Sequence, residues 1–532
     1  MSQAEAATPG GGAGGGSGSG TGGGGGGFGG SPGGGTGGGA EGGGGIGGSA
    51  EGGGADGAPG SEFRKEMGPW ANFALGFTYL SPVVSTYTLF GSALAKGGPP
   101  MIWAFALAGC GQFLVALVFG EVVAQYPIAG GVYPWARRLW GKRWAWMTGW
   151  VYMWALLVTI TSVAYGAGPY IAILLGFDSN VHTTVICTVI LIIVAALINF
   201  AGTKALSLAA VIGFSAELVG ALIVGIYLLV THRAHGLGVI FDNYGTAGNG
   251  SYLPVFLAAA IIGFYQYYGF EACGDTAEEV AHPGLVIPKA MRRTIYVGGA
   301  AATFTCGSLL LSVTDYGAVI SGKDTNPVVH LLFDAMGEVG ARLVMAVVLI
   351  SFLSCTISLQ AAAGRLIYSY ARDRMVAGHR LLRRFSPKRA VPEVALLVAA
   401  VVPGLIAFGS LISADALTKI VSFAILGIYG SFQMVVLAAL RARLKGWRAT
   451  GEFTLGRWGL LVNSAALAYG LFAIINICWA RTPEEPWYSN YIVLLCGGVV
   501  LVTGLLYMFT THHYGRGDAP SGDAVPSTSG AR

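Results

Sequence analysis

Apolar runs long enough to cross a bilayer recur along most of this chain. A membrane-spanning helix needs about 20 predominantly apolar residues. Twelve such runs lie near residues 69–94, 101–126, 145–175, 183–199, 207–231, 252–276, 294–314, 341–371, 392–410, 415–440, 458–480 and 489–511. Only 11% of the 532 residues are charged, whereas soluble domains carry about a quarter. We therefore predict an all-α polytopic membrane protein with twelve transmembrane helices.

The two ends of the chain differ from this apolar middle. Residues 1–62 are dominated by Gly with scattered Ser, Ala and Pro, a composition that cannot bury enough apolar surface to offset chain entropy. This stretch has no basic start followed by an apolar core, so it does not resemble a cleaved signal peptide. We expect a disordered tail over 1–62, a membrane domain over 63–515 and a second disordered tail over 516–532.

Lys and Arg are unevenly divided between the predicted loops. The loops on the side of both termini hold twenty of them, and the opposite loops hold only Lys96, Arg233, Lys323, Arg342 and Arg481. Because basic loop residues stay in the cytoplasm, we expect a multi-pass protein of the plasma membrane with both termini cytoplasmic. The basic residues are separated by spans and have no interleaved base-stacking pattern, which argues against nucleic-acid binding.

Two of the predicted spans contain residues that interrupt helices. The sixth holds Gly263, Gly269 and Gly274, and in the first, within "YLSPVVSTYTLFG", Pro82 lacks a backbone N–H. Unwound backbone inside a bilayer survives only where it lines a cavity or binds a solute. Interruptions five spans apart are typical of two inverted five-helix repeats with a substrate site between them. We therefore predict a five-plus-five repeat with broken helices 1 and 6.

Two stretches of the chain resemble signatures of the amino acid, polyamine and organocation permease superfamily. "GEVVAQYPIAGGVYPWARRLWGKRWAWMTGW" is similar to the superfamily's signature after the second span, and "YYGFEACGDTAEEVAHPGLVIPKAM" to its sixth-span signature. The resemblance covers about residues 65–515. The stretch "STYTLFGSALAKGGP" looks most like the amino acid/choline transporter branch. The resemblance implies a leucine-transporter-type fold and a secondary active transporter that moves an amino acid or related amine by alternating access.

The two interruptions supply the predicted substrate site. A half-helix that starts after the first interruption aims free N–H groups and a positive dipole end at a carboxylate. Carbonyls released in both spans can accept from an amine, and aromatic rings can cover the solute or stack on a cation. The expected substrate-binding residues are Ser81, Pro82, Ser85, Thr86, Phe264, Tyr267, Gly269, Phe270 and Glu271.

Glu217 is the predicted proton-coupling residue. It has about ten residues of apolar sequence on either side, and a carboxylate at that depth must be protonated, paired or facing water. In the resemblance it occupies the fifth-span place where some proton-coupled relatives carry a Lys. Sodium is the rival coupling ion, with Ser351, Ser354, Thr356 and Ser358 as its candidate oxygen ligands. We favour protons, because Ser and Thr are ordinary contacts between membrane helices.

Two further acids, Glu121 and Glu279, are expected to act in gating. For Glu121 the alternative is a structural pair with a loop Arg, and Glu279 is expected to hold a Lys or Arg of a neighbouring loop in one state. No enzyme is predicted, since the spans hold no His/Asp cluster and the chain has no Gly-x-Ser-x-Gly or His-Glu-x-x-His motif. The seven cysteines show no paired metal spacing, and no cofactor is expected.

The expected partners are an amino acid or amine and membrane lipids, with a monomer or weak homo-oligomer. A carrier of choline or polyamine-type cations and a non-transporting nutrient sensor remain alternatives.

Overall fold

The computed structural model describes residues 63–412, 416–481, 484 and 486–525. Within these residues the chain is helical and forms no strand longer than an isolated bridge. Ten of the helical segments described are long and apolar enough to cross a membrane. Two shorter apolar helical segments cover Tyr252–Gln266 and Glu393–Gly409. The all-α membrane architecture predicted from the sequence is therefore confirmed.

The helices are numbered in chain order. They are α1 (Pro69–Leu80), α2 (Pro82–Gly97), α3 (Trp103–Gln125), α4 (Val132–Trp140), α5 (Lys142–Leu175), α6 (Val181–Phe200), α7 (Thr203–Thr231), α8 (Tyr252–Ala259), α9 (Ile261–Gln266), α10 (Ala272–Asp275), α11 (Pro283–Ser312), α12 (Tyr316–Ile320), α13 (Pro327–Arg372), α14 (His379–Leu382), α15 (Glu393–Gly409), α16 (Ala416–Leu444), α17 (Gly459–Cys478), α18 (Trp487–Asn490) and α19 (Ile492–Thr511). Helix α13 bends at Gly337, where φ is 65°.

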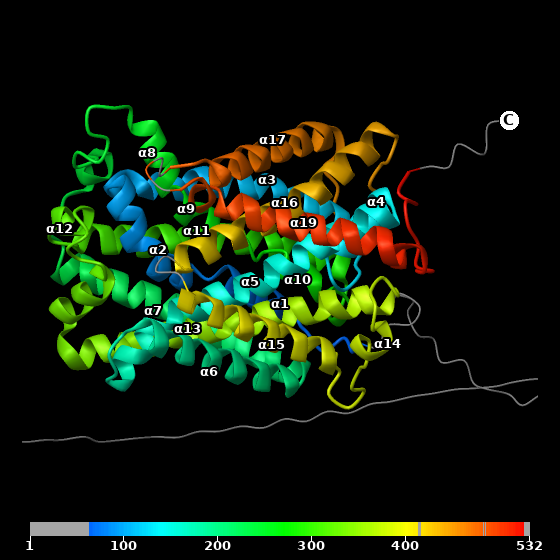
Figure 1. Ribbon diagram of the computed structural model, residues 1–532, viewed down its shortest axis with the longest axis horizontal. Coiled ribbons are helices and arrows are strands. Elements are labelled where there is room, and N and C mark those ends of the chain that lie inside the picture. The colour runs from blue at the N-terminus through cyan, green and yellow to red at the C-terminus, as the bar shows by residue number, and fades with distance from the viewer. Residues whose placement is uncertain (1–62, 413–415, 482–483, 485, 526–532) are drawn as a thin grey trace, which may run out of the picture. The chain divides into compact units, whose positions relative to one another are not determined.

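The segment formed by α1 and α2 lies at the centre of the packing. Helix α1 contacts α7, α11 and α13, and α2 contacts α8, α9, α11 and α13. In the most apolar 18-residue window of each segment, 94% of the window is buried in α1–α2, whereas 11% is buried in α19. In Figure 1 the long helices run roughly side by side, with α6 and α17 at opposite edges of the view and α1 and α10 between them. The first span therefore supplies the core, and apolar side chains of the outer helices are left to face lipid.

The first interruption separates α1 from α2 at a single residue. Ser81 has a φ of 36°, in a region that residues other than glycine rarely adopt. Pro82 begins α2, where its missing N–H costs nothing because first-turn donors have no partner within the helix. The Ser81 hydroxyl accepts from the Val84 N–H at 3.2 Å, which caps α2. The chain thus turns sharply inside the bundle, and the Val84 N–H in the first turn of α2 still has a hydrogen-bond partner.

The second interruption separates α9 from α10 over residues 267–271. Gly269 has a φ of 107°, which favours glycine. A Cβ added to Gly269 would lie 2.7 Å from the Leu80 backbone nitrogen, at the end of α1. The absence of a side chain at Gly269 therefore allows the two interruptions to pack directly against each other.

The described part of the C-terminal segment, residues 516–525, contacts α4. The Gly522 N–H donates to the Arg137 carbonyl at 2.8 Å, and the Ala524 N–H donates to the Arg138 carbonyl at 3.2 Å. Arg138 also pairs with Asp523 at 2.7 Å. These bonds cap carbonyls in the last turn of α4. The tail predicted over 1–62 and the last part of the one predicted over 516–532 lie outside the described residues, so the predicted domain boundaries stay a prediction.

Candidate functional site

Glu217 lies at a junction of three spans, beside the first interruption. The Ser81 hydroxyl donates to Glu217 Oε2 at 2.9 Å, and the Ser354 hydroxyl lies 3.4 Å from Glu217 Oε1. The α7 carboxyl is therefore bridged to the α1–α2 interruption and to α13. Only 1% of Glu217 is exposed, and no described residue forms an ion pair with it. Ser354, which the sequence suggested as a sodium ligand, is here a contact of Glu217.

The Ser81 and Ser354 hydroxyls at Glu217 differ in the number of acceptors to which each can donate its hydrogen. Ser81 already accepts from the Val84 N–H, so its own hydrogen is available for Glu217. The Ser354 hydroxyl has two acceptors within reach, Glu217 and the Ser351 carbonyl at 3.1 Å. When its hydrogen points to Ser351, the Ser354 oxygen can accept from a protonated Glu217. The site thus suits both protonation states of the carboxyl without moving a backbone.

Polar side chains that flank the two interruptions also contact each other. The Ser85 hydroxyl donates to Gln266 Oε1, which joins α2 to the end of α9. The amide nitrogen of Gln266 and the hydroxyl of Thr86 are fully buried and have no hydrogen-bond partner. A buried donor left unpaired costs about 1–3 kcal/mol, so such groups are expected where a polar solute binds. Ser85 and Thr86 were predicted for this site, whereas Gln266 was not.

Glu271 is tied to the unwound backbone of the second interruption. Its Oε2 accepts from the Gly269 N–H at 2.7 Å, and its Oε1 accepts from the Tyr152 hydroxyl at 3.2 Å. The same hydroxyl lies 3.3 Å from Oδ2 of Asp275. All three residues are buried. Tyr152 and Asp275 were missed in the sequence, because a tyrosine in a long apolar span carries no signal of its partner.

The aromatic residues predicted for the site point in different directions. Tyr267 lines a groove of about 740 Å³ between α3 and α11, where a Cβ on Gly299 would meet its hydroxyl at 2.5 Å. Phe270 packs against Phe119, with ring centroids 5.9 Å apart. The Phe264 carbonyl accepts from the Tyr429 hydroxyl at 3.3 Å. Tyr267 thus faces α3 and α11, Phe270 packs against α3, and their predicted substrate contacts stay predictions.

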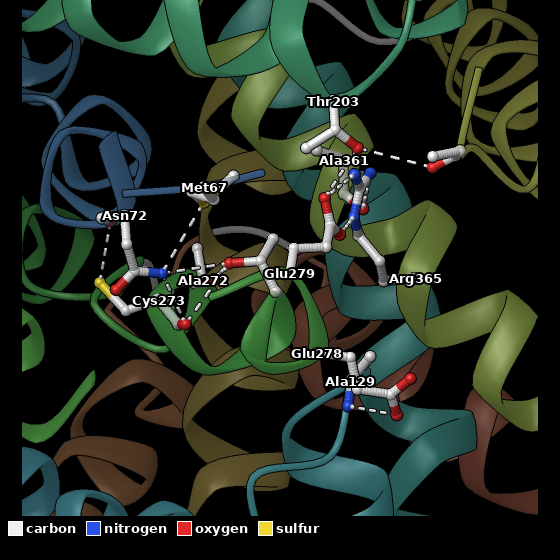
Figure 2. A network of polar contacts seen from close by, with 12 residues as sticks. Met67, Asn72, Ala129, Thr203, Ala272, Cys273, Glu278, Glu279, Ala361 and Arg365 are labelled. Carbon is white, nitrogen blue, oxygen red and sulfur yellow. Dashed lines mark hydrogen bonds and ion pairs between the residues drawn. The ribbon is translucent and has the colours of Figure 1, made fainter. Parts of the chain in front are cut away.

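A buried ion pair joins the segment that follows the second interruption to α13. Arg365 Nε and Nη2 donate to the two carboxylate oxygens of Glu279 at 2.7 and 3.1 Å, and the Thr203 hydroxyl donates to Glu279 Oε2 at 2.9 Å. Figure 2 shows these three side chains meeting from separate elements. The Arg365 and Glu279 side chains are at most 1% exposed. We call Glu279, Arg365 and Thr203 the Glu279 network.

Neighbouring contacts join the start of α1 to residues next to the Glu279 network. Asn72 donates to the Cys273 carbonyl at 2.9 Å (Figure 2). The Met67 N–H donates to the Glu279 carbonyl at 3.0 Å. The Ala129 N–H donates to Glu278 at 3.2 Å, which connects the loop before α4. Elements from both interrupted spans therefore converge on the Glu279 network.

Glu121 lies in a separate ion pair. It binds Arg443 of α16 and accepts from the Leu455 N–H at 2.8 Å. Arg443 also donates from Nε to Asn463 of α17 at 3.1 Å. Glu121 therefore ties α3 to α16 and α17, away from the Glu279 network, and its gating role stays a prediction. Among the described residues, no group of three or more His, Cys, Asp and Glu side chains is arranged to hold a metal ion.

Comparison with known proteins finds similarity over most of the chain. A family model described as amino acid permease matches residues 67–501. An amino-acid permease of Arabidopsis thaliana is 24% identical, over 85% of this chain and 93% of its own length. A putative amino acid/polyamine transporter of Macrophomina phaseolina is 27% identical, over 78% of this chain and 96% of its own. An L-asparagine permease of Streptomyces coelicolor is 24% identical, over 78% of this chain and 84% of its own.

Proposed function

Because this chain belongs to the amino acid permease family, we propose that it is a proton-coupled secondary transporter that moves an amino acid or related amine across the plasma membrane by alternating access. Membership makes the protein a membrane transporter of small molecules and not an enzyme. The contact of Glu217 with Ser81 at the first interruption carries the proposal of proton coupling.

The proposed transport domain has twelve spans in two inverted five-helix repeats. The ten long apolar segments would make twelve spans if the two shorter apolar helices also cross the membrane. The interruption at Ser81 falls within the first of these, and the interruption at residues 267–271 directly follows the sixth, Tyr252–Gln266. Their direct packing at Gly269 supports a shared site between the repeats.

The proposed substrate site lies where the two interruptions meet. The unpaired amide nitrogen of Gln266 would donate to the carboxylate of the solute, and the Thr86 hydroxyl would donate to that carboxylate or accept from the amine. The start of α2, whose N–H groups point toward the interruption, favours a negative substrate group. Binding there would exchange unpaired buried donors for charge-assisted hydrogen bonds, which are about twice as strong as neutral ones.

Proton coupling follows from the position of Glu217 between moving parts. Alternating access requires that one repeat rocks against the other around the site. Such motion changes how α7 lies relative to Ser81 and Ser354, and hence whether Glu217 has donors or acceptors around it. A Glu217 that is supplied with donors holds its charge, and one that loses them takes up a proton. Substrate movement would in this way depend on proton binding.

The Glu279 network is proposed to be the cytoplasmic gate. The excess of basic residues in the loops at that end supports a cytoplasmic location, with both termini on the same side. With the network closed, a solute at the interruptions has no path to the cytoplasm past Arg365 and Glu279. Breaking this ion pair while water enters would open the inward path.

Transport by purified protein tests the proposal. Full-length protein in proteoliposomes is supplied with labelled amino acids, asparagine and a polyamine included, under an inward proton gradient or an inward sodium gradient. We expect accumulation of one or more amino acids with the proton gradient alone. Accumulation that requires a sodium gradient would show that sodium is the coupling ion, and it would contradict proton coupling through Glu217. Saturable binding without flux of any solute would indicate a sensor.

A further inference from the structure

Two buried carboxyls, Glu271 and Asp275, share one tyrosine hydroxyl. They lie one helical turn apart at the two ends of α10, and both are fully buried. The Tyr152 hydroxyl of α5 is 3.2 Å from Glu271 and 3.3 Å from Asp275. A hydroxyl carries a single hydrogen, so at any moment Tyr152 donates to one carboxyl and is free to accept from the other.

The remaining hydrogen bonds distinguish the two acids. Glu271 also accepts from the Gly269 N–H at 2.7 Å, so both of its oxygens have a donor, as an ionised carboxylate requires. Oδ1 of Asp275 has no partner. That oxygen faces Gly131, where even an added Cβ would overlap it. An ionised Asp275 would leave a charged oxygen without any donor, whereas a protonated one donates from Oδ2 to Tyr152.

In the described part of the chain, no cation pairs directly with either acid. Among the described residues, neither acid forms an ion pair, and Arg365 is engaged by both oxygens of Glu279. The titratable and charged groups that face the pair are Tyr79 of α1, Tyr152 of α5, Cys273 of α10 and Arg365 of α13. Two adjoining charged carboxylates away from water are unfavourable, so the pair favours holding a proton.

We propose that Glu271 and Asp275 hold one exchangeable proton between them through Tyr152, which makes them a second proton site in addition to Glu217. The hydrogen-bond pattern favours Asp275 as the acid that carries the proton. Transfer is balanced: Asp275 gives its proton to the Tyr152 oxygen while Tyr152 gives its own to Glu271, and the tyrosine stays neutral. The pair connects the unwound backbone at Gly269 with the segment that leads to Glu279.

The use of this site in transport rests on the proposed proton-coupled function, because release would follow opening of the Glu279 network and entry of water to Asp275. The Gly130 N–H holds the Asp275 carbonyl at 3.1 Å, so the loop before α4 covers the acid on that side. Motion of this loop would expose Asp275 first. The existence of the shared proton does not depend on transport.

Infrared spectroscopy of the full-length protein in liposomes tests the proposal directly, by the difference between the spectrum of each variant and that of its parent protein. A protonated carboxyl has a C=O stretch that an ionised one lacks. In a Glu217→Gln background, where that acid contributes nothing, we expect one such band at neutral pH. Asp275→Asn should abolish it, and Tyr152→Phe should shift it, because the acceptor of its hydrogen bond is gone. Glu278→Gln is the matched control, since Glu278 pairs with Arg372 at 3.1 Å and should contribute no band.

A band that survives Asp275→Asn, or the absence of a band from the starting protein, would overturn the proposal. Tyr152→Phe keeps nearly the same volume, so it serves if Asp275→Asn fails to fold; an unshifted band there would also overturn it. Proton and substrate fluxes measured together give the functional arm. We expect the number of protons per substrate to fall in Asp275→Asn while substrate exchange at equal concentrations continues. Loss of exchange with an intact band pattern would count against the proposed function and not against the shared proton.

Discussion

Removing Arg365 is expected to open the Glu279 network. The Arg365→Ala variant leaves Glu279 buried, with the Thr203 hydroxyl at 2.9 Å as its remaining side-chain donor. Removing one partner of a buried ion pair costs about 3–5 kcal/mol, and this cost applies only while Glu279 is out of water. At about 1.4 kcal/mol per factor of ten, the open form should gain at least about a hundredfold in population relative to the closed form.

The native Cys273 reports on this opening. Its thiol is fully buried beside the network, where it donates to the Asn72 carbonyl at 3.4 Å. A water-soluble thiol reagent should modify it only when the network opens, so its labelling rate follows the open population. We expect the rate in Arg365→Ala to rise by about a hundredfold or more, with the site of labelling assigned by mass spectrometry.

Arg372→Ala is the matched control, on the same helix two turns further along. Arg372 pairs with Glu278 at 3.1 Å, but its side chain is 26% exposed, so the pair is partly solvated. Such pairs contribute about 1 kcal/mol or less. Labelling of Cys273 that rises no more in Arg365→Ala than in Arg372→Ala would refute the reasoning, because burial of the ion pair would then have no special weight.

Three further predictions concern the solute site, the C-terminal segment and topology. Gln266→Leu should weaken substrate affinity by about tenfold, since the lost hydrogen bond is worth about 1–1.5 kcal/mol, while Ser215→Ala on an exposed face of α7 should leave uptake kinetics unchanged. Deletion of residues 516–532 should lower the thermal unfolding temperature in detergent, because α4 loses its capping bonds; an unchanged temperature would show that the segment adds no stability. Cysteines introduced at Asp242 and Arg383 should be labelled from outside intact cells at Asp242 only, and labelling at Arg383 would contradict the proposed orientation.

Local chemistry made both interruptions predictable from the sequence. Pro82 and Gly269 act through their own backbone restrictions, proline by its missing N–H and glycine by its tolerance of positive φ. The same holds for Glu217, because a carboxyl within a long apolar run is conspicuous without any knowledge of its neighbours. These features depend on a few adjacent residues; in the structure α1 ends at Leu80, α9 ends at Gln266, and Glu217 is 1% exposed.

Partners that come from distant parts of the chain were not predictable in the same way. Ser81 and Ser354 lie 136 and 137 residues from Glu217, and nothing local distinguishes them from other hydroxyls in spans. The direction of Tyr267 depends on the unwound backbone at residues 267–271, where helical periodicity no longer applies. The pairing of Asp275 with Glu271 through Tyr152 likewise required the packing of α5 against the second interruption.

Proton coupling through Glu217 is tested most directly by pH-driven accumulation in proteoliposomes. Glu217→Gln keeps the size and hydrogen bonding of the side chain and fixes it in a neutral form. We expect this variant to retain substrate binding and exchange at equal concentrations, but to accumulate much less substrate under a proton gradient, with an altered pH dependence. Glu338→Gln, at a side chain that is 70% exposed, is the matched control and should accumulate substrate normally. Accumulation by Glu217→Gln with an unchanged pH dependence would contradict the assignment of coupling to Glu217.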